Sequence, residues 1–385
     1  MKRYCCRLPQ AGLTLIELMI SMAIGLLIVL ALITMLIDVS RNNSDMSKTN
    51  RVIENGRFAL QLLQADISLA SYWSGFIPQF DDLNTAGVPT DVPSAVPDPC
   101  LEYTAANWNA AHKINLIGLG VQAYEIPATV PSPTLPVCAT KVVRPKANTD
   151  VLLVRHAENC VPGVGSCATN TAGDLYFQAA RCGDTVPNPA YVLDTAGFTL
   201  KSRDCTSTAE LRKFVSSLYY IRDYAVTEGD GIPMLMRSQF GLSTGGVLEH
   251  KAAEALIEGI EGFRVEFGID NVSDSGEAVD FSAAINWANP DILTSPRNRG
   301  DGIPDAADIR CTTAVPCTVA QLMNAVVVKL YVLVRSEKST PGYIDSKTYH
   351  MGSTTLGPFN DAFKRHLFMQ TVRLTNISAR RETPP

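Results

Sequence analysis

The sequence predicts an α+β protein in which one long N-terminal helix packs on an antiparallel β-sheet head with large insertions. An apolar run with a single charge occupies Leu13–Ile37. Apolar residues then continue at helical spacing to about Tyr72, and segments of alternating apolar and polar residues follow much further along the chain. One helix followed by a series of strands is the order typical of an α+β fold.

The apolar run is long enough to cross a membrane. Its 25 residues would extend about 37 Å as a helix, and a bilayer core is roughly 30 Å thick. Fifteen of them are Leu, Ile or Val, and Glu17 is the only charged one. A carboxylate inside a membrane segment costs about 2–3 kcal/mol and is usually retained for a function. Glu17 is therefore a candidate functional residue.

The residues before the run do not form an ordinary secretory signal. Lys2, Arg3 and Arg7 make this segment basic, and the small residue Gly12 precedes the apolar region instead of following it. A cleaved signal has a shorter apolar region followed by small residues. Basic residues hold the N-terminal side in the cytoplasm, so we expect everything after the run to be exported.

Gly12, the apolar run and Glu17 together resemble the class III leader of type IV pilins and type II secretion pseudopilins. The resemblance implies that a prepilin peptidase cuts between Gly12 and Leu13 and that Leu13 is then N-methylated. Residues 1–12 would be the leader, and Glu17 would be the fifth mature residue and act in assembly. The first mature residue of these families is usually Phe, and here it is Leu. The alternative is a signal anchor with a stray Glu.

The helix is expected to continue beyond the membrane. Residues 13–37 would form its transmembrane half, 38–72 its amphipathic half, and 73–385 the exported globular head. The alternative is a break near Asn42-Asn43-Ser44, followed by an independent amphipathic helix.

The head is predicted to contain an antiparallel sheet. Residues 77–140, rich in Pro, Ser, Thr and Ala, predict long loops or an irregular insertion. A Gly-Asp-Gly turn at 229–231 joins two strands, and Ala252–Ile260 predicts a short helix. The strand candidates are Val151–His156, Leu218–Val226, Met234–Phe240, Gly262–Ile269, Ala325–Arg335 and His366–Asn376.

Charge and cysteine content limit the function further. Loss of the basic leader takes the net charge from −5 to −8, which excludes the basic surface that nucleic-acid binding needs. Eight cysteines follow the leader, and in an exported chain an even number predicts disulfides. No C-x-x-C pair outside the leader supports the alternative, a zinc site. Pairing by sequence proximity, among 105 possible connectivities, gives Cys100–Cys138, Cys160–Cys167, Cys182–Cys205 and Cys311–Cys317.

Two short motifs resemble chemical sites without completing them. Arg155-His156 lies in a string similar to the one that opens histidine phosphatases, but Ala157 replaces the glycine, and a strand-end histidine is the alternative. Asp301, Asp305 and Asp308 match half of a calcium loop, whereas two arginines occupy its first ligand positions. The alternative there is a plain turn. We expect no cofactor and no catalysis.

Further strings are similar to PilW-type minor pilins. The likeness is strong over the first 75 residues and scattered over the last 170. The strings are Asn55-Gly56-Arg57-Phe58-Ala59-Leu60, Leu218-Tyr219-Tyr220-Ile221-Arg222, Ile257-Glu258-Gly259-Ile260-Glu261, and the last strand from Arg365 to Asn376.

This resemblance implies a structural subunit in the complex that initiates the type IV pilus and caps its tip. Its implied partners are other minor and major pilins, the prepilin peptidase, the inner-membrane assembly machinery and a tip adhesin. It would span the inner membrane once, with its head in the periplasm, and later lie on the pilus at the cell surface. The alternatives are a type II secretion pseudopilin, a pilus-borne adhesive module and a signal-anchored periplasmic enzyme.

Overall fold

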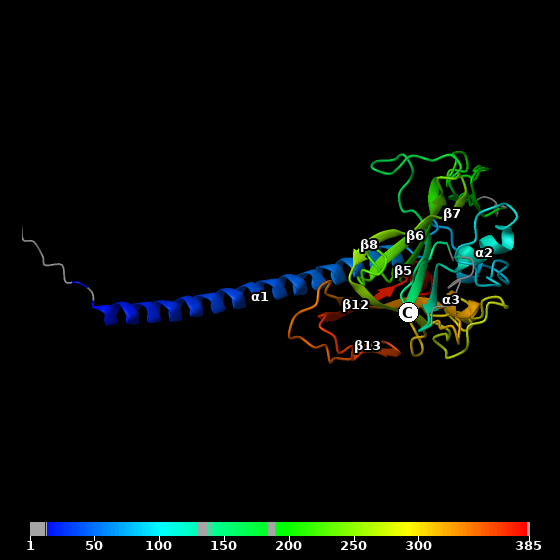
Figure 1. Ribbon diagram of the computed structural model, residues 1–385. Coiled ribbons are helices and arrows are strands. Elements are labelled where there is room, and N and C mark those ends of the chain that lie inside the picture. The colour runs from blue at the N-terminus through cyan, green and yellow to red at the C-terminus, as the bar shows by residue number, and fades with distance from the viewer. Residues whose placement is uncertain (1–11, 13, 130–137, 139, 184–188, 383–385) are drawn as a thin grey trace, which may run out of the picture. The chain divides into compact units, whose positions relative to one another are not determined.

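The computed structural model describes residues 12, 14–129, 138, 140–183 and 189–382. The chain divides into two compact units, the first ending at Arg51 and the second beginning at Val52. Figure 1 shows the second unit as a β-rich head whose strands lie against the last turns of the first helix. The α+β class predicted from the sequence, with a long apolar helix before an antiparallel head, is confirmed.

The helix α1 runs without interruption from Leu15 to Ile67, so the alternative with a break near residues 42–44 is wrong. The helix ends five residues before the predicted Tyr72. Its last turn tightens through hydrogen bonds from Leu69 N–H to the Asp66 carbonyl and from Ala70 N–H to the Ile67 carbonyl. Ser71 then takes a left-handed backbone conformation with φ of 59°, which turns the chain away from the helix axis.

One face of α1 is buried in the core of the second unit. At Gly56 the helix approaches the strand β15 (Arg365–Arg373) so closely that a Cβ atom would lie 2.2 Å from a ring carbon of Phe368. The absence of a side chain is therefore required at this position. The buried residues on this face are Val52, Gly56, Ala59, Leu60, Leu63 and Ile67.

The larger sheet has eight strands, all joined in antiparallel pairs. β5 pairs along one side with β2; on its other side its start pairs with β3 and its end with β6. The strands are β1 (Val121–Ile126), β2 (Thr149–Ala157), β3 (Tyr176–Ala179), β4 (Tyr191–Asp194), β5 (Leu211–Arg222), β6 (Met234–Leu242), β7 (Leu248–His250) and β8 (Glu254–Glu258).

A second sheet places β12 (Ala325–Arg335) between β9 (Ile260–Ile269) and β15 (Arg365–Arg373), again antiparallel. One core cluster joins apolar residues of α1 to residues of both sheets, so the helix and the two sheets share a single interior. The remaining elements are η1 (Gln79–Asp81), α2 (Ala110–Gly118), α3 (Val319–Met323), α4 (Thr375–Arg381) and the strand pairs β10 (Trp287–Asn289) with β11 (Thr294–Pro296) and β13 (Tyr349–Met351) with β14 (Thr354–Leu356).

All six predicted strands are present, with shifted ends. The fifth matches β12 in both bounds, whereas the strand placed at Leu218–Val226 begins earlier, at Leu211, and ends at Arg222. The last strand stops at Arg373 because the chain then turns into α4. The loop carrying the predicted Gly-Asp-Gly turn does join two strands, β5 and β6.

One prediction for the head is wrong, and another is incomplete. The short helix expected over Ala252–Ile260 is the strand β8 and the start of β9, because residues 254–258 pair with β6 as a sheet ladder. Residues 77–140 are not only loops, since they contain η1, α2 and β1. Asn109 caps α2 by accepting the His112 N–H at 2.9 Å.

Candidate functional site

Thr14 and Glu17 form a capping box at the start of α1. A Glu17 carboxylate oxygen accepts the Thr14 backbone N–H at 2.9 Å and the Thr14 hydroxyl at 2.8 Å. In return, the Thr14 hydroxyl oxygen lies 3.4 Å from the Glu17 N–H. The carboxylate therefore satisfies an N–H group that the helix cannot bond internally and places negative charge at its positive end. The predicted role of Glu17 in assembly did not include capping of the helix, although the Thr-x-x-Glu spacing before an apolar run indicates a capping box.

The apolar segment that follows is exposed along its whole length in the single chain. Leu15, Leu26 and Leu36 are examples, with 79%, 65% and 70% of their surface accessible. The helix is long and apolar enough to cross a membrane. Within the described residues, the groups that bond Glu17 both belong to Thr14. The predicted cleavage and methylation site at Leu13 lies outside the described residues, next to Gly12.

The opposite end of α1 is fixed to the head by polar contacts. The carboxylate of Asp66 lies 2.8 Å from Nε2 of His156 in β2, and its other oxygen accepts the Tyr219 hydroxyl of β5 at 2.8 Å. Nearer the middle of the helix, the Asn55 side-chain amide donates to the Glu258 carbonyl at 3.0 Å. These bonds hold the helix in one register on the larger sheet.

Four disulfides link the loops of the head. They are the four pairs predicted from sequence proximity. Their Cα atoms are 4.8–6.1 Å apart, within the range of natural disulfides. Chain entropy makes each worth roughly 2–4 kcal/mol of stability. The pairs are Cys100–Cys138, Cys160–Cys167, Cys182–Cys205 and Cys311–Cys317.

The acidic loop is built differently from the calcium motif. Asp301 and Asp305 lie with Asp270, their nearest carboxylate oxygens within 4.8 Å of one another, whereas Asp308 instead pairs with Lys329 at 2.6 Å. Asp270 accepts the Gly302 N–H at 2.9 Å and pairs with the buried Arg381 at 3.0 Å. The loop is therefore ordered by protein donors and already holds a positive charge.

The phosphatase-like string is buried inside the sheet. Arg155 and His156 are 1% and 4% exposed, and all nine residues of β2 are buried. Burial of the Arg155 guanidinium lowers its pKa to about 10. A side chain enclosed in this way cannot meet a substrate, and His156 already bonds Asp66 and the Ala157 carbonyl.

Two family models match the chain. The model of the type IV pilus-assembly protein W, PilW, matches residues 218–376, which run from β5 to α4. The prokaryotic N-terminal methylation motif matches residues 7–36, which contain Gly12, Leu13 and Glu17. The two matches together indicate a minor pilin of the PilW type. Its methylation motif indicates anchoring in a membrane through α1, and its family implies interaction with other pilus components.

Other comparisons add little. Among solved structures, the chain is similar to the type IV-like pilin TTHA1219 from Thermus thermophilus, with 13% identity over 60% of this chain and 80% of that one, at a TM-score of 0.23. No curated protein matches. The family suggests a structural subunit of the pilus. In the structure, the buried His156 and the half-buried Asp66 contact each other.

Proposed function

We propose that this minor pilin belongs to the complex that initiates type IV pilus assembly and remains at the pilus tip. The observation that carries the proposal is the carboxylate of Glu17 at the start of an apolar segment whose side chains are exposed from Leu15 to Val39. Within the described residues, this carboxylate is bonded by Thr14. A helix with this apolar surface needs a bilayer or other such helices around it.

In this proposal the helix serves two environments in turn. Leu13–Ile37 first spans the inner membrane with the basic leader in the cytoplasm and the head in the periplasm. The prepilin peptidase then cuts after Gly12, and Leu13 becomes the methylated N-terminus. During assembly the apolar helix leaves the bilayer and packs among the helices of other pilins, with the head displayed at the cell surface.

Glu17 would fix the register of that packing. Its carboxylate already accepts the Thr14 N–H and hydroxyl, and one oxygen takes part in neither bond. The α-amine of a neighbouring subunit's first residue supplies a cation for it. Two unit charges 4 Å apart at an effective dielectric constant near 20 attract by about 4 kcal/mol before desolvation. Such a pair favours the one axial position at which it forms.

The head contributes contacts and no chemistry. His156, which lies in the phosphatase-like string, is buried, and so is His250, which contacts Ser216 and Ser238. Lateral contacts with partner pilins, and with a tip adhesin, would use the surface of the head.

Immunogold labelling of sheared pili tests the tip position, and pilus counts in a strain lacking the chain test initiation. We expect label at fibre ends and a severe loss of pili, restored by the intact gene. Label distributed along the shaft, or normal piliation without the chain, would contradict the proposal. Normal piliation with defective secretion of exported proteins would favour the pseudopilin alternative.

A further inference from the structure

The strand β1 forms one edge of the larger sheet. It pairs with β2 alone, over all six residues from Val121 to Ile126. Alternate residues of an edge strand direct their backbone N–H and C=O groups away from the sheet. Within the described parts of the chain, no backbone hydrogen bond joins these outward groups of β1 to another segment. Tyr124 and Glu125 are the half-buried residues of β1 and the other four are buried, so this edge is accessible to a further segment at residues 124 and 125.

A cavity of about 520 Å³ adjoins this edge. Its size is in the range of binding pockets, roughly 300–1,000 Å³. The disulfide Cys311–Cys317 and Leu322 of α3 form one apolar wall, and Val96–Pro99 forms another. Residues 122–125 of β1 form the side between them. A partly accessible strand edge beside a mainly apolar cavity is an arrangement that suits binding of an extended peptide.

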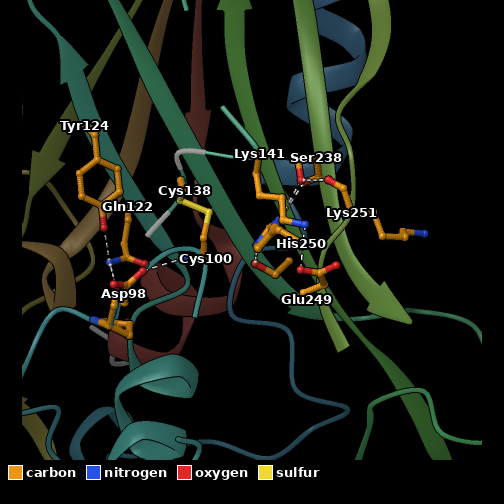
Figure 2. Close-up of a disulfide and its surroundings, with 12 residues drawn as sticks. Asp98, Cys100, Gln122, Tyr124, Cys138, Lys141, Ser238, Glu249, His250 and Lys251 are labelled. Carbon is orange, nitrogen blue, oxygen red and sulfur yellow. Dashed lines mark hydrogen bonds and ion pairs between the residues drawn. A yellow bond between two sulfur atoms is a disulfide. The ribbon is translucent and has the colours of Figure 1, made fainter. Parts of the chain in front are cut away.

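The cavity is lined by polar groups, of which those of Tyr124 and Asp98 are partly accessible and that of Gln122 is buried. The buried Gln122 side chain donates its amide to the Pro97 carbonyl and to the Tyr124 hydroxyl, each at 3.1 Å. Its oxygen has no hydrogen-bond partner among the described residues. Burial raises the pKa of Tyr124 to about 12, so its hydroxyl keeps a proton to donate. Figure 2 shows Gln122 and Tyr124 with Asp98 beside the disulfide Cys100–Cys138.

The charge around the cavity is negative. Asp98 and Glu125 line it, and no Lys, Arg or His does so among the described residues. Glu125 is paired with Arg310 at 3.0 Å, whereas Asp98 accepts only the Cys100 N–H and has no ion-pair partner in the described chain. Burial raises the pKa of Asp98. A cation placed beside it would offset that cost, because an opposite charge favours the ionised carboxylate.

We propose that the edge of β1 and this cavity bind an extended segment of a neighbouring pilin. The segment lies along Tyr124 and Glu125, inserts an apolar side chain between Pro97 and the Cys311–Cys317 loop, and places a Lys or Arg beside Asp98. The neighbour's identity as a pilin rests on the proposed function, while the edge, the cavity and the charge define the segment's chemistry.

Photocrosslinking in piliated cells tests the proposal. Tyr124→p-benzoylphenylalanine in the full chain should give an adduct with another pilin, mapped by mass spectrometry to an extended segment carrying apolar and basic residues. Pro316→Trp, at the rim of the cavity, should lower the adduct yield at least about tenfold, since burial of one Leu-sized side chain is worth that factor. Asp98→Asn, which keeps the acceptor for Cys100, should lower it roughly two- to fivefold, as expected for one ion pair.

The matched control is Val315→Trp, in the same loop but 68% exposed and outside the cavity, which should leave the yield unchanged. p-Benzoylphenylalanine at Val226, 86% exposed at the tip of the β5–β6 loop, should give no adduct with that segment. An adduct with a second copy of this chain, with lipid only, or equally from position 226 would overturn the inference. So would the absence of any adduct in cells that incorporate the chain into pili normally, a result that leaves the proposed function standing.

Discussion

Asp66 and His156 are 90 residues apart in the sequence, and their side chains are 2.8 Å apart in the head. The other ring nitrogen of His156 lies 2.8 Å from the Ala157 carbonyl, and the second Asp66 oxygen accepts the Tyr219 hydroxyl. Both ring nitrogens thus lie beside oxygen atoms. The three side chains fasten the last turns of α1 to two central strands.

Asp66→Asn should therefore loosen the helix from the sheet. The amide keeps the shape but offers only one acceptor oxygen, which leaves a buried donor on His156 or Tyr219 without a partner. One such loss costs roughly 1–3 kcal/mol. Urea unfolding of the detergent-solubilised full chain, followed by tryptophan fluorescence, should show that decrease. Glu54→Gln changes an exposed carboxylate on the same helix and should shift stability by less than about 0.5 kcal/mol. Equal effects of the two changes would contradict the role of Asp66.

His250 gives the head a dependence on pH. Its ring is 1% exposed and lies 3.3 Å from the hydroxyl oxygens of both Ser216 and Ser238, the second of which is visible in Figure 2. Burial, assisted by the charge of Arg155, lowers its pKa from 6.5 to about 3. The folded chain therefore holds His250 neutral, while the unfolded chain takes up a proton below about pH 6.5, so acid favours unfolding.

We expect His250 to remove about 2 kcal/mol of stability between pH 6.5 and pH 5. His250→Gln cannot take up the proton and should remove that part of the pH dependence, whatever its effect at neutral pH. His350→Gln, at an exposed site on β13, should leave the dependence unchanged. The test measures the unfolding free energy of the three proteins at about pH 5.0, 5.75 and 6.5 and compares how steeply it changes with pH. A slope for His250→Gln equal to that of the unmodified chain would refute the assignment.

The sequence predicts those parts of the fold that depend on the local order of apolar and polar residues. Long apolar or alternating runs form β2, β9 and β12. Both faces of these strands are largely buried, so their sequences are apolar enough to be recognised as strands. The sequence predicts a helix where β8 forms, because Ala255 and Ile257 in a short polar segment fit both a helical and a strand periodicity. Pairing with β6 makes the segment a strand. Strands of three or four residues, such as β3 and β7, depend in the same way on the neighbours they meet.

Some residues of the candidate site can also be recognised in the sequence, whereas others depend on the fold. Gly12 and Glu17 stand out because a small residue and a lone charge interrupt an apolar context. The partners of Asp66 cannot be predicted from the sequence, because His156 and Tyr219 lie on strands whose register is fixed only in the folded head. The edge of β1 lies in the stretch 77–140, where the sequence predicts loops and where the strand is recognisable only beside β2.

Leader processing provides a direct test at Gly12. N-terminal mass analysis of the membrane-inserted protein should find methylated Leu13 as the first residue, because the methylation motif covers residues 7–36. Gly12→Val places a branched side chain at the cut and should leave the leader attached, with Met1 retained. Gly25→Ala, at the glycine inside the apolar segment, should be processed normally. A mature start beyond residue 30 would contradict the prediction.

Glu17 connects the leader to assembly, and its two candidate roles make opposite predictions. As a cap for α1 alone, the carboxylate is worth about 1 kcal/mol, and its loss would be tolerated in a long apolar helix. As a register contact with a neighbour's α-amine, it is needed for every insertion into a fibre. Glu17→Val removes the carboxylate and its insertion cost, so membrane levels should be equal or higher.

Incorporation into pili should nevertheless fall severely with Glu17→Val, because the neighbour's amine then enters the fibre core without a counter-charge. Glu17→Asp keeps the charge on a shorter arm and should retain part of the incorporation. Thr14→Ala is the matched control: it removes one hydroxyl from the capping box and leaves the carboxylate, so it should assemble nearly normally if register is what matters. Counts of surface pili and blots of sheared fibres, normalised to membrane levels, measure all three. Normal incorporation of Glu17→Val would leave Glu17 with the capping role only.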